Sequence, residues 1–179
     1  MTLNTEISIS DIIASISLFL VVIGGIFAFF QWRKNLLLKR ADYINELTEK
    51  IRTDVDIKDT IYIFDYSEPW YDQNFHGSKE LEIKVDKTLS YFSYICYLKA
   101  NRIISEKEFG FFKYEIKRIL INPYVQDYFY NLYHFANRNN VPITFDYLFK
   151  YGRKSVFDAT FFDKFAYKTS SIYHRYLNF

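Results

Sequence analysis

The residues best suited to bind a charged ligand lie along one predicted helix. Lys107, Tyr114 and Arg118 share a face of this helix, and Lys113 and Lys117 lie beside it. Ammonium and guanidinium groups bind phosphates and carboxylates. The free N–H groups of the next helix, predicted to begin at Asn122-Pro123, also favour an anion. We take Lys113, Lys117 and Arg118 as candidate residues for binding an anion or a nucleotide; a solvated charged face is the alternative.

A second basic cluster, at residues 150–154, adds Arg153 to the candidates. Charge is also segregated along the chain. Residues 42–86 hold 12 acidic and 5 basic residues, whereas residues 87–179 hold 7 acidic and 14 basic residues. The two halves could therefore pack against each other, within one subunit or between subunits, without any ligand. Because the charges of the whole domain balance, binding to duplex nucleic acid is not expected.

The sequence offers no catalytic or metal-binding arrangement. His76, His134 and His174 lack the mutual spacing of metal ligands. There is neither a glycine-rich phosphate loop nor a nucleophile elbow. The lone cysteine, Cys96, lies among apolar residues, as a small buried side chain would. We therefore expect a protein that is not an enzyme, with no catalytic residues, no metal and no cofactor.

An uncharged stretch of 21 residues, 12–32, predicts a membrane anchor. At about 1.5 Å per residue, a helix of this length spans roughly 30 Å, the thickness of a bilayer's hydrocarbon core. Acidic residues precede the stretch and no small-residue cleavage site follows it, which distinguishes it from a signal peptide. The next basic residues are Arg33, Lys34, Lys39 and Arg40. Because positive charge stays cytoplasmic, we expect the N-terminus outside a bacterial inner (cell) membrane and the rest in the cytoplasm.

Small residues recur along the predicted span at helical spacing. Ala14, Ser17, Gly24 and Ala28 lie on one stripe, and the last two form a small-xxx-small pair. Such residues let two helices approach closely in lipid. We take these four as candidates for transmembrane association, so a homo-oligomer in the lipid bilayer is expected. A general richness of membrane helices in small residues is the alternative.

Apolar residues recur at helical spacing along the rest of the chain. The expected fold class is all-α, with a single N-terminal transmembrane helix that continues into a small cytosolic helical bundle. The expected organisation is residues 1–11 outside, 12–32 in the membrane, 33–56 as a juxtamembrane helix, 57–152 as the helical domain and 153–179 as an aromatic-rich C-terminal helix or tail.

Local patterns predict several helix ends. Ser105 and Glu108 have the spacing of a capping box. Asn122-Pro123 is typical of a helix start, with asparagine as N-cap and proline at the first helical position. Thr144 is predicted to cap a short helix that stops at Gly152.

The stretch "KVDKTLSYFSYICYLKANRIISEKEFGFFKYEIKRILINPYVQDYFYNLYHF" resembles a group of short, uncharacterised bacterial proteins. They have one N-terminal span and a cytosolic helical domain of unknown function, and the likeness covers roughly residues 10–152. Some proteins of this build belong to anti-phage systems, in which a cytosolic sensor triggers membrane disruption, including effectors gated by cyclic oligonucleotides. The resemblance carries over no site residues.

Two functions are open at this point. The first is a membrane-anchored bacterial sensor or effector, linked by the resemblance to antiviral defence. Its helical domain would bind a signal, such as a cyclic nucleotide or a protein, and act through an oligomeric transmembrane segment. The second is a passive membrane scaffold that recruits a cytosolic protein partner.

Overall fold

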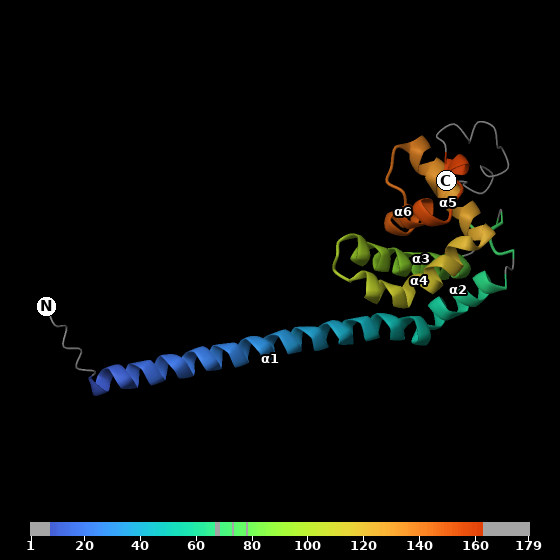
Figure 1. Ribbon diagram of the computed structural model, residues 1–179. Coiled ribbons are helices and arrows are strands. Elements are labelled where there is room, and N and C mark those ends of the chain that lie inside the picture. The colour runs from blue at the N-terminus through green and yellow to red at the C-terminus, as the bar shows by residue number, and fades with distance from the viewer. Residues whose placement is uncertain (1–7, 67–68, 73, 78, 163–179) are drawn as a thin grey trace. The chain divides into compact units, whose positions relative to one another are not determined.

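Helix α1 contains the whole uncharged stretch and extends beyond it. The computed structural model describes residues 8–66, 69–72, 74–77 and 79–162. Within them α1 spans Ile9–Thr53 as one helix of 45 residues (Figure 1). Its side chains are exposed from residue 8 to residue 42, apart from the partly covered Ile23. By length and composition, α1 is the one described helix that could cross a membrane.

The remaining helices form a second unit, which begins at residue 48. They are α2 (Val55–Asp65), α3 (Lys79–Ala100), α4 (Glu106–Ile121), α5 (Pro123–Asn139), α6 (Asp146–Ser155) and the short 3₁₀ helix η1 (Ala159–Phe162). The central helix is α3, which packs against α2, α4 and α6, while α5 packs against α4 and η1 (Figure 1). No strand occurs among the described residues, so the predicted all-α fold, with a long apolar N-terminal helix followed by a helical domain, is confirmed.

The helix break between α1 and α2 falls inside the range 33–56, which was predicted to be one juxtamembrane helix. α1 ends at Thr53, and Asp54 is the N-cap of α2. The Asp54 carboxylate accepts hydrogen bonds from the backbone N–H groups of Asp56 (3.1 Å) and Ile57 (3.3 Å). An aspartate at this position satisfies two N–H groups that would otherwise lack partners, which favours a new helix start.

The capping predictions for α4 and α5 are confirmed. Ser105 Oγ accepts from the N–H of Glu108 (3.3 Å), and the Glu108 carboxylate accepts from the N–H of Ser105 (2.6 Å), which completes a capping box. Asn122 Oδ1 accepts from the N–H of Val125 (3.1 Å), and Pro123 occupies the first helical position of α5.

The prediction for the ends of α6 is wrong at both sides. The N-cap residue is Phe145, not Thr144, and it makes no side-chain cap hydrogen bond. Phe145 has a left-handed backbone (φ 58°), and its buried ring packs against Phe129. The helix also continues through Gly152 to Ser155. Glycine is needed there for space and not for a helix end, since a Cβ atom on Gly152 would lie 2.5 Å from a ring carbon of Phe157.

The loop between α2 and α3 is held by buried aromatic side chains. Trp70, Tyr71 and Phe75 are buried, and their ring centroids lie 5.3–5.6 Å from one another. Tyr128 of α5 packs against all three and donates a hydrogen bond to Asp86 of α3 (2.8 Å). The described aromatic residues of this segment therefore belong to the core of the domain, to which large aromatic side chains contribute much buried area.

Ion pairs join the acidic and basic halves of the domain. Lys87 of α3 lies 2.8 Å from carboxylate oxygens of both Asp54 and Asp56. Its ammonium group lowers the pKa of Asp54. Arg118 of α4 likewise pairs with Asp65 of α2 (2.8 Å). Part of the charge segregation is therefore used for packing within one subunit.

The predicted C-terminal element, 153–179, is described as far as Phe162, and residues 163–179 lie outside the described residues. Phe157 and Phe162 are buried and pack against each other and against Phe149 of α6. The chain up to Phe162 is therefore part of the helical domain.

Candidate functional site

Three of the predicted ligand-binding residues lie on α4. Lys113 and Lys117 are exposed, with no ion pair among the described residues. Arg118 is half-buried and engaged by carboxylates: its Nε lies 2.8 Å from Asp65 and its terminal nitrogen 2.9 Å from Glu115. Its guanidinium also lies 5.5 Å from the Tyr114 ring centroid. An anion at this face would have to compete with two carboxylates for Arg118.

Two of the three N–H groups of residues 124–126, at the start of α5, are already bonded within the domain. Pro123 has no N–H group, and the N–H of Val125 is bonded to the side chain of Asn122. The N–H of Gln126 is bonded to the Asn122 carbonyl (3.1 Å). Asn122 itself is buried, and its side-chain N–H₂ group donates to the carbonyl of Phe64 in α2 (2.7 Å). This cap therefore holds α2 and α5 together and uses the N–H groups of Val125 and Gln126, which leaves the N–H of Tyr124 as the remaining donor of residues 123–126.

The fourth predicted residue, Arg153, has a different environment. Its guanidinium carbon lies 5.4–5.9 Å from the ring centroids of Tyr133, Phe149 and Phe162. These rings belong to α5, α6 and η1, whereas the ring beside Arg118 is that of Tyr114 on α4. Cation–π packing of this kind gives the arginine a structural role.

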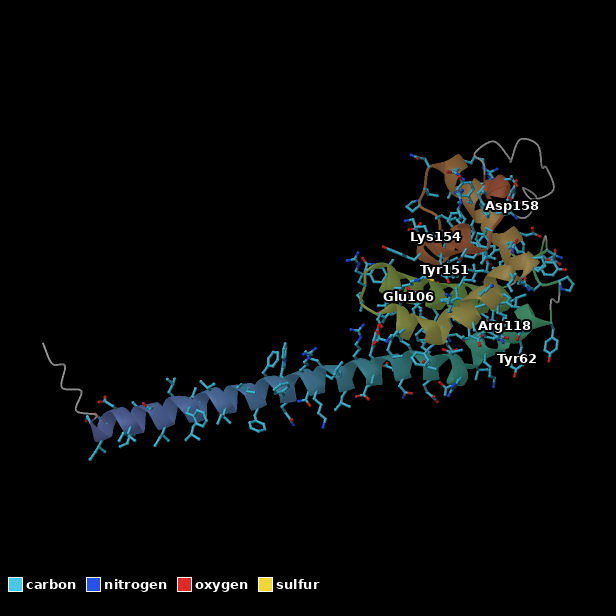
Figure 2. All side chains as sticks on the ribbon, viewed as in Figure 1. Tyr62, Glu106, Arg118, Tyr151, Lys154 and Asp158 are labelled. Carbon is cyan, nitrogen blue, oxygen red and sulfur yellow. The ribbon has the colours of Figure 1, made fainter. Side chains whose placement is uncertain are left out.

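A basic groove, not identified from the sequence, lies between α3 and α6. Its volume is about 430 Å³, and its lining is mostly apolar. The residues that line it are Cys96, Lys99 and Ala100 of α3 with Tyr147, Lys150, Tyr151, Lys154 and Ser155 of α6. Figure 2 shows Tyr151 and Lys154 on α6, with Glu106 at the start of α4 and Arg118 in another part of the domain.

The three lysines of this groove differ in their partners. Lys99 Nζ lies 3.0 Å from Glu106 and 4.4 Å from the Phe109 ring centroid. Lys150 Nζ lies 2.6 Å from Asp146, within the same helix. Lys154 is exposed and has no ion pair among the described residues. The groove and its rim therefore carry three ammonium groups against two carboxylates.

Two ionisable side chains of the groove, Cys96 and Tyr151, are neutral at physiological pH. Burial raises the pKa of the Cys96 thiol to about 12, which excludes a reactive thiolate. Burial also raises the pKa of the Tyr151 hydroxyl, despite the opposing effect of Lys99. The groove is thus suited to binding through charge and ring contacts, and no nucleophile or general base is evident in it.

The residues predicted to associate in the membrane all lie on α1 and are exposed. Ala14, Ser17, Gly24 and Ala28 are separated by three, seven and four positions, which places them on one side of a helix. A Cβ atom added at Gly24 would meet nothing within 4 Å in the described chain. Packing within one chain therefore does not require a glycine at this position.

The chain matches no protein-family model, no curated protein and no solved structure. Within the described residues, no group of three or more His, Cys, Asp or Glu side chains could hold a metal ion. Two features of the described residues carry the main functional argument: the exposed apolar surface of α1 and the basic groove between α3 and α6.

Basic residues alone do not reveal this groove in the sequence. Lys150 and Lys154 belong to the basic cluster at residues 150–154, of which Arg153 is the predicted ligand-binding residue. On a helix Tyr147, Tyr151 and Lys154 follow one another at spacings of four and three, so they share a face. The alternation of aromatic and basic residues on that face was the available indication.

Proposed function

We propose that this protein is a membrane-anchored sensor or effector whose helical domain binds a signal and acts through association of its transmembrane helix. One observation carries the proposal. The apolar, exposed stretch of α1 and the first helix turns of the domain belong to a single helix of 45 residues. A membrane segment and a folded domain joined in this way can share a conformational change, provided that the ligand binds two states with different affinity.

The exposed apolar surface of α1 supports membrane insertion. Between Ile9 and Leu38, 17 large apolar side chains are each at least 47% exposed. Burying one such side chain contributes about 1.5–3 kcal/mol. Inserting this surface into a bilayer would therefore contribute tens of kcal/mol, and a patch of this size left in water would cause aggregation.

The flanking charges support an N-terminus outside the cell. No lysine or arginine precedes the apolar stretch, whereas Arg33 and Lys34 follow it immediately. Together with the resemblance described above, this favours the inner membrane of a bacterium, with the helical domain in the cytoplasm and a role in antiviral defence.

The glycines of α1 support association between copies of the chain. Glycine inside a helix costs about 1 kcal/mol relative to alanine, and no neighbour within the described chain requires Gly24. Close approach of a second helix is a physical reason for this cost. A homo-oligomer formed through Ala14, Ser17, Gly24 and Ala28 would bring such a second helix into contact with Gly24.

Cross-linking in membranes tests this proposal. In a Cys96→Ala background, Ser17→Cys on the stripe should form a disulfide-linked dimer upon oxidation. The double variant Gly24→Leu with Ala28→Leu should lower the dimer yield at least several-fold, because larger side chains separate the helices.

The matched control changes the opposite side of the same helix. Ile26→Leu with Phe30→Leu, at about 100° per residue, should leave the dimer yield unchanged. If the leucines at positions 24 and 28 also leave the yield unchanged, association through this stripe is excluded. The passive scaffold then becomes the better account.

A passive scaffold is the second candidate, and the outer face of α4 favours it. Phe111, Tyr114 and Ile121 are 68%, 69% and 55% exposed on this helix. Apolar side chains grouped on a surface are typical of a protein-binding site. A scaffold that instead recruits its partner through the C-terminal tail would lose that partner when residues 163–179 are deleted. The deletion must begin after Phe162, because the buried Phe157 and Phe162 belong to the core.

A further inference from the structure

The basic groove between α3 and α6 has the chemistry of a binding site for a small organic anion. We infer that it binds a phosphate-bearing ligand with a planar ring, the chemical class to which nucleotides belong. The identification of this ligand as the signal that the sensor detects rests on the proposed function. Binding itself is argued from the groove alone.

The size and lining of the groove fit such a ligand. Its volume of about 430 Å³ lies within the range of roughly 300–1,000 Å³ that is typical of small-molecule sites. Most of its surface is apolar, and its polar groups are concentrated in three lysines and Ser155. Sites of this kind bind the apolar part of a ligand by burial and orient it with a few charged groups.

The lysines supply the phosphate-binding part. Lys154 has no ion pair among the described residues, so its ammonium group is available without breaking a contact. The ammonium group of Lys150 pairs with the partly exposed carboxylate of Asp146. Four methylene groups make the lysine side chain flexible. An exposed pair of this kind is weak, so Lys150 can turn towards a phosphate. Ammonium groups bind phosphates as mobile point charges.

Two tyrosines supply the ring-binding part. Tyr147 and Tyr151 lie one helical turn apart on α6 and both line the groove. The Tyr151 ring packs edge-on against Phe109 (5.5 Å), which fixes it in place. The ammonium groups of Lys99 and Lys150 lie 5.5 and 5.6 Å from the ring centroids of Tyr151 and Tyr147, so a planar ring would have to displace them in order to stack. Such stacking contributes about 1–3 kcal/mol per nucleic-acid base in other proteins.

Another hollow of the domain lacks this chemistry. It lies between α2 and α3, has a volume of about 490 Å³, and is lined partly by Asp59 and Glu80. Lys84, its lysine, is paired with Glu80 (3.1 Å). Two carboxylates against one ammonium group repel a phosphate, so this hollow is a poorer phosphate site than the groove between α3 and α6.

Thermal unfolding of the full chain in lipid nanodiscs tests the inference. The probes are AMP, cyclic AMP and a cyclic dinucleotide, with adenosine and inorganic phosphate as the two halves of the ligand. At a hundred times its Kd, a nucleotide that binds only the folded state should raise Tm by about 5–10 °C. Adenosine and phosphate at the same concentration should give little shift, because each engages only one part of the groove.

Variants locate the site. Lys154→Gln with Lys150→Gln should weaken nucleotide binding about tenfold or more, because two charged contacts with phosphate are lost. The matched control, Lys113→Gln with Lys117→Gln, removes two exposed lysines from α4 and should leave binding unchanged. Ala100→Trp, which places an indole in the groove, should abolish the shift while the unliganded protein still unfolds cooperatively.

Three outcomes overturn the inference. The first is that none of the nucleotides shifts Tm at millimolar concentration. The second is that the shift persists in the lysine and Ala100→Trp variants. The third is that the control pair abolishes the shift, which would move the site to α4. These results are independent of the cross-linking test of α1, so failure of the ligand site and failure of the proposed function can be distinguished.

Discussion

The hydrogen bonds of Asn122 lead to a specific prediction for its replacement by aspartate. Asn122 is 5% exposed and connects two helices. Its Oδ1 accepts from the N–H of Val125, and its Nδ2 donates to the carbonyl of Phe64. Aspartate is as good an N-cap as asparagine, so Asn122→Asp keeps the first bond. It cannot keep the second while ionised, because a carboxylate has no hydrogen to donate.

The cost follows from these two bonds. Leaving the buried Phe64 carbonyl without a donor costs about 1–3 kcal/mol, and placing an ionised carboxylate beside it adds a desolvation cost. We therefore expect Asn122→Asp to lower the free energy of unfolding by about 3 kcal/mol at pH 7.5. Asn122→Ala, which also loses the cap, should cost about 2–4 kcal/mol.

The pH dependence separates the two variants. Burial raises the pKa of the new carboxyl above its value in the unfolded chain, so the folded state takes up a proton more readily. A protonated carboxyl can donate to Phe64, and the cost of Asn122→Asp relative to the unmodified protein should therefore shrink as the pH falls towards 4.5. The cost of Asn122→Ala should not change with pH.

Urea unfolding in detergent micelles measures these differences. A Trp32→Phe background leaves Trp70 as the single tryptophan, and Trp70 is buried 5.3 Å from the ring of Phe64. Equal stability of the aspartate variant and the unmodified protein at pH 7.5 would refute the reasoning. A pH-independent cost for the aspartate would show that the bond to Phe64 is not the cause.

Three further predictions concern the core of the domain. Gly152→Ala should lower the free energy of unfolding by about 1 kcal/mol, because overlap with the Phe157 ring outweighs the gain in helix propensity. The same substitution should cost less in a Phe157→Leu background, in which the ring is absent. An unchanged cost in that background would contradict this explanation. Burial raises the pKa of Asp86, so stability is lost as the pH rises above 3.8 through the folded-state pKa. Asp86→Asn can still accept from Tyr128, and thermal unfolding from pH 4 to 7 should therefore show a higher and flatter Tm; a Tm below that of the unmodified protein at pH 7 would count against it. Cys96, with a pKa of about 12, should resist alkylation by iodoacetamide at pH 8 until urea is added, and rapid labelling of the native protein would be the contrary result.

Local patterns predicted those parts of the fold that depend on neighbouring residues. The capping box at Ser105 and the proline start of α5 were identified because each needs only three or four consecutive residues. The end of α6 was not, because Gly152 is explained by the Phe157 ring, which packs against it from beyond the helix. A glycine that ends a helix and a glycine that admits a neighbour look alike in the sequence.

The candidate site was harder to predict for the same reason. Of the two carboxylate partners of Arg118, Glu115 is three positions away, but Asp65 is 53 positions away in the chain and meets it only in the folded domain. The groove joins Lys99 and Lys154, which lie 55 positions apart on α3 and α6. Helical periodicity predicts the face on which a residue lies, but not the helix that this face meets.

The most direct test of the central claim is the topology of the chain in a bacterial membrane. Single cysteines at Ser10 and at Lys117, in a Cys96→Ala background, report on the two sides when intact cells are treated with a membrane-impermeant maleimide. The account predicts labelling of the cysteine at position 10 in intact cells. It predicts labelling of the cysteine at position 117 only after permeabilisation, with both proteins retained in carbonate-washed membranes. Labelling of position 117 in intact cells, or release of the chain by carbonate, would contradict a membrane-anchored protein with a cytoplasmic helical domain.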